Sequence, residues 1–272
     1  NPVGAQTAVT AGELVYTATE PLANEQMAYR QVSGALIIRN AIYRAGPDGA
    51  NQMRIRQLHG HLWSPRYSPD GSRIAFVHNA SGRGQIHVMR TDGSETVNVS
   101  HNEFCDRSPV WSPDGEKIVF VSDREGDWDI YLMDADGNRQ TRLAGNPGVD
   151  RAPAWSPDGK RIAWESHVSG LPNIWVCDVD GRNSRTFVDP DKRLKIDGLE
   201  RAPDGGVNLR NVEFYFGPSR VFSDNALYLM DPVWSPDGKR IAAVMVAYGT
   251  GNMIAVLDPD GTQILGIIEW IS

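Results

Sequence analysis

The chain has little cysteine, no long apolar run and no excess of positive charge. Only Cys105 and Cys177 occur in 272 residues, which is too few cysteines for a disulfide scaffold. No uninterrupted run of about 18 apolar residues is present, so the sequence predicts no transmembrane segment. The formal net charge is −7 at pH 7, whereas binding to phosphates needs a basic surface. Nucleic acid is therefore not expected as a partner.

Compact catalytic motifs are also missing from the sequence. The chain contains no Gly-x-Ser-x-Gly elbow, which is the motif that exposes the nucleophile of the α/β-hydrolases. Its histidines do not follow the close spacing of a metal-ligand motif. These absences favour a protein without catalytic activity, with an enzyme as the alternative.

One seven-residue stretch recurs through the chain. It consists of a proline, any residue, an aromatic residue and then Ser-Pro-Asp-Gly. Proline presets φ, aspartate hydrogen-bonds back to the backbone and glycine adopts a positive φ, so the stretch predicts a strand that ends in a tight turn. The copies end at Gly71, Gly115, Gly159 and Gly238. The first two intervals between these glycines are 44 residues and the third is 79.

Each complete interval holds four predicted strands. In residues 105–148 they cover 107–112, 117–122, 129–133 and 140–143. Four short strands at intervals of about ten residues are typical of one β-propeller blade. We therefore predict an all-β fold: a six-bladed propeller of four-stranded antiparallel blades in one domain, 1–272, with a five-bladed ring as the alternative. The expected blades are 1–60, 61–104, 105–148, 149–192, 193–231 and 232–272.

Two segments depart from the regular repeat. At the beginning of the chain, residues 5–10 and 13–17 predict a pair of strands. Residues 21–32 then begin with a proline and continue with good helix formers, which predicts a short helix. Residues 193–231 predict a shortened blade, with strand-like runs at 212–216 and 226–230.

The residues of the repeat resemble a known family. The motif Val110-Trp-Ser-Pro-Asp-Gly115, the connection Ser122-Asp-Arg-Glu-Gly126 and the strand around Ile130-Tyr131 together resemble the repeat of TolB-type β-propellers. The resemblance covers 61–192 and 232–261 well. It implies a periplasmic or extracellular protein that binds a protein partner at the mouth of the propeller channel. The related architecture of oligogalacturonate lyase implies a metal held by histidines at the central face.

Polar residues are expected to gather around this channel mouth. In a propeller the Ser-Pro-Asp-Gly turns would lie on one face, and the blade lead-ins and second-to-third strand connections on the other. Tyr248 and residues 165–167 belong to these connections. Charged hydrogen bonds between blades are the structural alternative to ligand contact, and Trp111, Trp155 and Trp234 are expected in the core between blades. The candidate ligand-binding residues are Asp106, Arg107, Asp123, Arg124, Asp150, Arg151, His167 and Asp231.

Histidines supply a weaker hypothesis for the same face. Neutral imidazoles at convergent positions can hold a divalent transition metal, although solvated loop histidines are common. The candidate metal ligands are His59, His61, His78 and His167. No cofactor is expected otherwise.

Three functions remain open on the sequence alone. The first is a monomeric, non-enzymatic module that binds a protein or peptide at the channel mouth. The second is a lyase or hydrolase on an acidic sugar, in which arginines would hold carboxylates and histidines, with or without metal, would do the chemistry. The third is a structural repeat module. Fold alone cannot decide between them, because function depends on the site.

Overall fold

In the computed structural model, every described element is a β-strand. The first sheet contains β1 (Ala8–Thr10), β2 (Glu13–Thr19), β3 (Arg39–Ala45) and β4 (Met53–His59), in that order. The structure describes residues 8–10, 13–19, 39–46, 48, 50–80, 82–145, 147–168, 172–186, 194–196, 199–201, 207–209, 212–214, 227–247, 251–260 and 264–269. The predicted helix at 21–32 and the candidate Tyr248 lie outside these residues.

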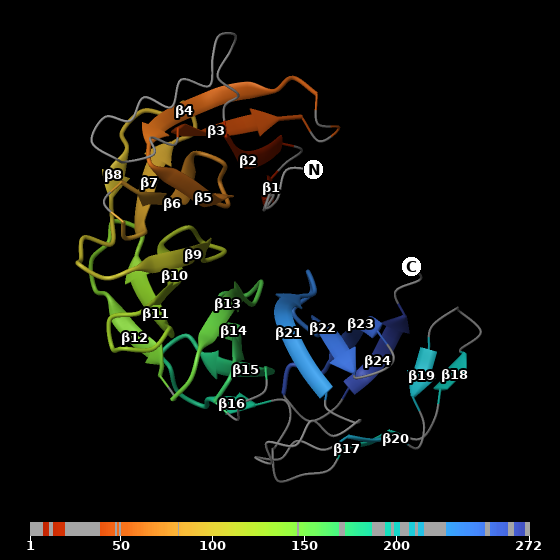
Figure 1. The fold of residues 1–272 in the computed structure, drawn as a ribbon. Helices are drawn as coiled ribbons and strands as arrows, with labels where there is room; N and C mark the ends of the chain where they lie inside the picture. Colours follow the sequence, from red (N-terminus) through yellow and green to blue (C-terminus); the bar gives the residue numbers. More distant parts are fainter. Residues whose placement is uncertain are drawn as a thin grey trace. The chain divides into compact units, whose positions relative to one another are not determined.

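Three further sheets follow the 44-residue repeat and keep the strand order of the chain (Figure 1). The second contains β5 (His61–Tyr67), β6 (Arg73–Asn79), β7 (Gln85–Arg90) and β8 (Val97–Asn98). The third contains β9 (Asp106–Trp111), β10 (Lys117–Ser122), β11 (Asp129–Asp134) and β12 (Thr141–Ala144). The fourth contains β13 (Asp150–Trp155), β14 (Arg161–Ser166), β15 (Asn173–Asp178) and β16 (Arg185–Thr186). These sheets confirm the four-stranded antiparallel units that the sequence predicts.

The last part of the chain is less regular. A six-stranded sheet has the order β18-β19-β24-β23-β22-β21 and a separate pair joins β17 to β20. The strands are β17 (Leu194–Ile196), β18 (Leu199–Arg201), β19 (Val207–Leu209), β20 (Val212–Phe214), β21 (Leu227–Trp234), β22 (Ile241–Ala247), β23 (Gly251–Leu257) and β24 (Ile264–Glu269). Here the structure differs from our expectation, because β21 begins at Leu227 and crosses the blade boundary expected before residue 232. The number of blades stays a prediction.

The chain divides into two compact units, which we describe separately. Unit 1 contains residues 1–124 and 132–140, and unit 2 contains 125–131 and 141–272. The core of unit 1 includes the fully buried Ile74 and Phe76. The core of unit 2 includes the fully buried Ile174 and Leu229 together with Trp234. Among the described residues, no helix is long and apolar enough to span a membrane.

The Ser-Pro-Asp-Gly turns form as predicted. In the first copy the Ser68 hydroxyl donates to Asp70 Oδ1 at 2.5 Å, and the Gly71 N–H donates to the Ser68 carbonyl at 2.9 Å. The serine hydroxyl and nearby N–H groups hold the pKa of Asp70 down at about 2. Gly71 has φ +70°, which glycine adopts without strain. The copies at Gly115, Gly159 and Gly238 have φ values between 69° and 72°.

The repeat tryptophans join one sheet to the next. Within unit 2, the Trp234 indole N–H donates to the Ala154 carbonyl at 3.2 Å, and the Arg161 guanidinium lies 4.6 Å from the ring centroid. In unit 1 Trp111 makes the equivalent contacts with Arg66 and Arg73. Only 6–9% of the surface of Trp111, Trp155 and Trp234 is exposed, so the expectation that they belong to the core is confirmed.

Candidate functional site

A backbone irregularity shapes the first strand of each regular repeat. The residue before the proline has a positive φ in four copies, and strand pairing shifts register at this point in each of them. A bulge of this kind kinks the strand and redirects the side chains beside it. The four residues are Ser64, Ser108, Ala152 and Asp231, with φ values of 50–53°. The candidate aspartate–arginine pairs 106–107 and 150–151 directly precede two of these bulges.

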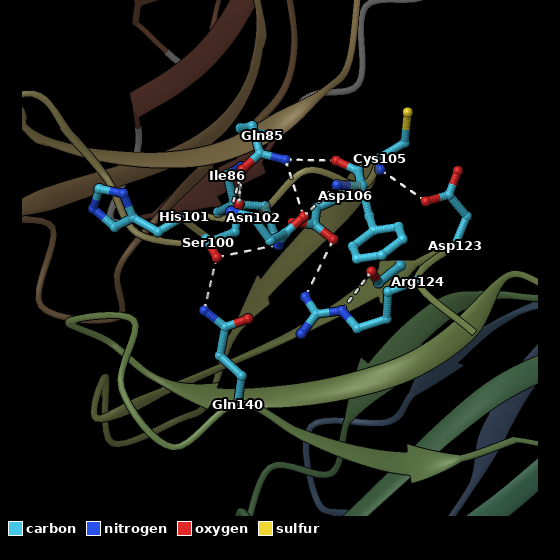
Figure 2. A network of polar contacts seen from close by, with 12 residues as sticks. Gln85, Ile86, Ser100, His101, Asn102, Cys105, Asp106, Asp123, Arg124 and Gln140 are labelled. Atoms are coloured by element: carbon cyan, nitrogen blue, oxygen red, sulfur yellow. Dashed lines mark hydrogen bonds and ion pairs between the residues drawn. The ribbon is translucent and has the colours of Figure 1, made fainter. Parts of the chain in front are cut away.

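In unit 1 the candidate residues form a buried ion-pair network (Figure 2). Asp106 is fully buried. The Arg124 guanidinium Nη2 lies 3.4 Å from Asp106 Oδ1, and the Asn102 amide donates to Asp106 Oδ2 at 2.6 Å. Arg124 Nε also donates to the Ser122 hydroxyl at 2.9 Å. The Asp106 carboxylate is therefore satisfied from within the protein.

The same network continues along the end of the second sheet. Gln85 is 9% exposed, and its amide donates to the Phe104 carbonyl at 2.6 Å while its carbonyl accepts from the Ser100 hydroxyl at 3.1 Å. The Cys105 N–H donates to Asp123 Oδ1 at 2.8 Å. Arg124 and Asp123 thus contact Asp106 and Cys105 within residues 105–148, and the Asn102–Asp106 hydrogen bond joins this repeat to the preceding one. These internal contacts favour the structural role for the three candidates Asp106, Asp123 and Arg124. Arg107 is half-buried on β9.

Unit 2 carries a second polar cluster, at the start of β13 and the end of β14. Glu165 is fully buried. Its Oε1 accepts from Arg151 Nε at 2.7 Å and lies 2.6 Å from Arg151 Nη2. His167 Nε2 lies 2.8 Å from the same oxygen, and the Asp231 N–H donates to Glu165 Oε2 at 3.3 Å. The structure therefore brings together three candidates, Arg151, His167 and Asp231, around one buried carboxylate.

The charged groups of this cluster remain partly accessible. The Arg151 side chain is 45% exposed and that of His167 is 28% exposed. Desolvation, and then the negative charge of Glu165, raise the pKa of Asp231, while Arg151 acts in the opposite direction. We name these four residues (Arg151, Glu165, His167 and Asp231) the Glu165 cluster. It presents donors and acceptors side by side.

Asp150 is held differently from the other candidates. It is fully buried, and among the described residues its two carboxylate oxygens have no hydrogen-bond partner. Burial raises the pKa of Asp150 to about 6. The nearby Ser166 hydroxyl lowers the pKa of Asp150, although the two side chains do not form a hydrogen bond of regular geometry. The negative charge of Asp129 raises the pKa of Asp150 further. Asp129 is itself fully buried, with Arg142 Nη2 2.9 Å from its Oδ2.

The histidine metal hypothesis gains no support from the described residues. Among them, no group of three or more His, Cys, Asp or Glu side chains is placed to hold a metal ion. His59 and His61 are exposed, and His59 contributes its backbone carbonyl to a contact with His78 Nε2 at 2.7 Å. His167 belongs to the Glu165 cluster. The four histidines divide between the units, three in unit 1 and His167 in unit 2.

Sequence reasoning missed two buried acidic groups that matter here. Glu165 belongs to the predicted connection at 165–167, and Asp129 belongs to the predicted strand at 129–133. One signal for Asp129 was present, because Gln85, Asp129 and Asn173 recur at intervals of 44 residues at the start of the third strand. Glu165 pairs directly with Arg151 across the β13–β14 hairpin, which the Ser-Pro-Asp-Gly turn predicts, although the bulge shifts this pairing by one residue from the regular register.

The comparisons with known proteins agree on the fold. No curated protein matches the chain. The chain resembles TolB from Acinetobacter baumannii with a TM-score of 0.62 at 20% identity, covering 94% of this chain and 52% of that one. Oligogalacturonate lyase from Vibrio parahaemolyticus has a TM-score of 0.59 at 14% identity, covering 93% and 65%. Puromycin hydrolase has a TM-score of 0.64 at 17% identity, covering 98% and 38%.

These structural neighbours include a TolB protein and two enzymes, so at such identities they establish the fold and no single activity. The chain spans about half the length of the Acinetobacter TolB. At the sequence level, the model of the TolB beta propeller domain matches residues 17–193. That match covers more than half of the 272 residues and includes three of the four turn motifs. The chain therefore belongs to the TolB β-propeller domain family.

Proposed function

We propose that this chain is a non-enzymatic module that binds a protein or peptide, and that the Glu165 cluster is part of its binding surface. The observation that carries the proposal is the state of Arg151. Its Nε and Nη2 are fixed by the buried Glu165 carboxylate, yet 45% of the side chain is exposed. An arginine held in this way loses little conformational entropy when a ligand binds.

The mixed polarity of the cluster suits a peptide. Arg151 and, when protonated, His167 can donate to the carbonyl or carboxylate groups of a ligand. The exposed Asp231 carboxylate can accept from backbone N–H groups or from a basic side chain. A peptide carries both kinds of group on every residue, whereas an acidic oligosaccharide would present its carboxylates to Asp231 as well. Charge repulsion at Asp231 therefore disfavours the acidic-sugar alternative.

The proposal extends to where the protein acts. Membership of the TolB family supports a periplasmic or extracellular location and a ligand at the expected channel mouth. Asp106, Arg107, Asp123, Arg124 and Asp150 remain candidates for ligand contact, although most of their described contacts are internal. We propose a monomer in this role.

The experiment is affinity capture followed by measurement of affinity for the captured protein. The chain, carrying a tag without histidines, is incubated with an extracytoplasmic extract of its source organism. The identified partner is then titrated against the unmodified protein and Arg151→Lys, which keeps the charge opposite Glu165 but removes the planar donor fork. We expect Arg151→Lys to bind at least tenfold more weakly.

The matched control is Arg240→Lys, an exposed arginine in the same unit just after the last Ser-Pro-Asp-Gly turn. Affinity should not change in this variant. The proposal would be wrong if the unmodified protein retained no partner, or if Arg151→Lys bound the partner as tightly as Arg240→Lys. Turnover of an acidic oligosaccharide by the purified chain would instead favour the lyase or hydrolase alternative.

A further inference from the structure

We propose a transition-metal site in unit 1 formed by His78 and His87, with its remaining coordination positions open to water or to a ligand. His87 was not among the histidines that the sequence singled out. The site is therefore distinct from the set predicted for the channel mouth, of which it shares only His78.

Strand register places both imidazoles on one face of the second sheet. In the β6–β7 ladder Phe76 pairs with His87 and His78 pairs with Gln85. His78 and His87 are thus diagonal neighbours, and alternate residues of a strand share a face. The Phe76 ring stacks against the imidazole of His87 at a centroid distance of 5.7 Å, which limits the freedom of that ring.

Hydrogen bonds to carbonyl groups fix which nitrogen of each ring is available. His78 Nε2 lies 2.7 Å from the His59 carbonyl oxygen, and His87 Nδ1 lies 3.2 Å from the Gln85 carbonyl oxygen. A carbonyl can only accept, so these nitrogens carry the protons. In the neutral rings the lone pairs are therefore on His78 Nδ1 and His87 Nε2. Histidines that bind metals commonly donate their other N–H to a carbonyl in this manner.

The separation of the rings fits a shared ion. The two ring centroids are 5.0 Å apart, at an interplanar angle of 68°. A zinc–imidazole bond of about 2.0–2.1 Å places each ring centroid roughly 3.2 Å from the metal. Two centroids at that radius and 5.0 Å apart subtend about 100° at the ion, close to the tetrahedral angle. Small side-chain rotations would then direct both lone pairs at one metal.

The surroundings also suit a transition metal. Both imidazoles are half-buried. Two imidazoles select zinc, copper or nickel rather than calcium or magnesium, which prefer oxygen ligands. Within the described part of the chain no third protein ligand completes the site.

The test uses the tag-free chain and Zn²⁺, Ni²⁺ and Cu²⁺ as separate probes. Calorimetric titration should show one saturable site for these ions and none for Mg²⁺. His78→Asn and His87→Asn should each weaken binding at least tenfold. Electron paramagnetic resonance of the Cu²⁺ form should show hyperfine coupling to two imidazole nitrogens, reduced to one in either variant. Zn²⁺ should also raise the thermal midpoint of the unmodified protein but not that of His78→Asn or His87→Asn, because a ligand stabilises the state that binds it.

His61→Asn is the matched control. His61 pairs with Asn79 on the neighbouring strand, so it occupies the opposite face of the same sheet and should bind metal like the unmodified protein. Circular dichroism verifies that each variant is folded. The proposal is overturned if His78→Asn and His87→Asn bind as tightly as His61→Asn, or if only weak binding at several sites appears. Failure here would leave the protein-binding proposal intact, because that proposal rests on unit 2.

Discussion

The third and fourth repeats use the same buried aspartate in opposite ways. Asp106 and Asp150 lie 44 residues apart at the start of β9 and β13, and both are fully buried. Asp106 has the Arg124 guanidinium beside it. The residue 44 positions after Arg124 is Val168, and among the described residues Asp150 has no hydrogen-bond partner for either carboxylate oxygen. The third repeat therefore pairs this aspartate with an arginine, whereas the fourth repeat leaves the equivalent aspartate, Asp150, without such a partner among the described residues.

The fourth repeat places its charge pair elsewhere. Glu165 stands where the third repeat has Val121, and His167 where it has Asp123. The arginine before the bulge is half-buried as Arg107 but exposed as Arg151. In the fourth repeat the arginine is therefore a partly exposed partner of the buried Glu165 carboxylate, whereas the third repeat pairs its buried Asp106 with Arg124, which is 16% exposed. The proposed binding surface depends on this difference.

Removal of Arg124, the cation beside Asp106 in the third repeat, should have the largest effect on the free energy of unfolding. Arg124→Ala leaves the buried Asp106 carboxylate with Asn102 as its remaining side-chain partner among the described residues, and breaking a buried ion pair costs about 3 kcal/mol or more. We expect urea denaturation at pH 7.5 to show that loss in the free energy of unfolding. Val168→Ala, at the equivalent position, should cost less than about 1 kcal/mol. Equal losses in the two variants would contradict the comparison.

Neutralising the Asp150 carboxylate of the fourth repeat should instead raise the free energy of unfolding. The pKa of Asp150 is about 6 in the folded protein and about 3.9 in an unfolded chain. Between these values the folded state binds more protons, so stability falls as pH rises from about 4 to above 6. Asp150→Asn should therefore raise the free energy of unfolding at pH 7.5, by on the order of 2–3 kcal/mol, and should flatten its pH dependence.

Measurement of unfolding between pH 4 and pH 8 tests this sign directly. Asp106→Asn is the paired variant, and it should destabilise the protein at pH 7.5 because it removes the charge opposite Arg124. A loss of stability in Asp150→Asn at pH 7.5 would show that the carboxylate is ionised and well paired in the native protein.

Placing an arginine in the fourth repeat, at the position equivalent to Arg124, should have a smaller effect, which we expect on the pKa of Asp150. Val168→Arg puts a guanidinium at the position equivalent to Arg124, where it can approach Asp150. The pKa of Asp150 should then fall, since an opposite charge favours the ionised form. NMR titration of the Asp150 carboxyl carbon would measure the change. An unchanged pKa would mean that the position of the cation is not what distinguishes the two repeats.

The smallest effect on stability is expected at His167. Its side chain is 28% exposed and contacts a carboxylate that Arg151 already pairs. His167→Gln should change the free energy of unfolding by about 1 kcal/mol or less, while binding of the captured partner weakens measurably. A large stability loss with unchanged partner binding would make His167 a structural residue.

The sequence predicted the regular parts of the fold because local chemistry specifies them. The Ser-Pro-Asp-Gly turns depend on neighbouring residues alone, and the strand pair at the beginning of the chain appears as β1 and β2. The run predicted at 226–230 becomes the first part of β21, but the boundary expected before Pro232 falls inside this strand, which continues to Trp234. In the structure the bulge at Asp231 carries the strand through that proline, as bulges can.

The candidate site was predictable only in part. The repeated Asp-Arg pairs at 106–107 and 150–151 were visible as a pattern, but the choice between ligand contact and internal pairing depends on side-chain direction. Arg124 turns back to Asp106, 18 residues earlier, and Glu165 turns inward to Arg151 and His167. Both pairings join consecutive strands of a predicted hairpin, but the bulge before the proline shifts the register by one residue, and the repeated motif does not show this shift. The diagonal pair His78 and His87 likewise follows from the register of β6 and β7.

The most direct test of the binding account is site-specific photo-crosslinking within unit 2. A photo-reactive amino acid is introduced in place of His167, in the Glu165 cluster, and separately in place of the exposed Lys239, in the last Ser-Pro-Asp-Gly turn region. After irradiation in an extracytoplasmic extract, the account predicts a covalent adduct with one protein from position 167 and none from position 239. Adducts from position 239 alone, or from neither position, would contradict it.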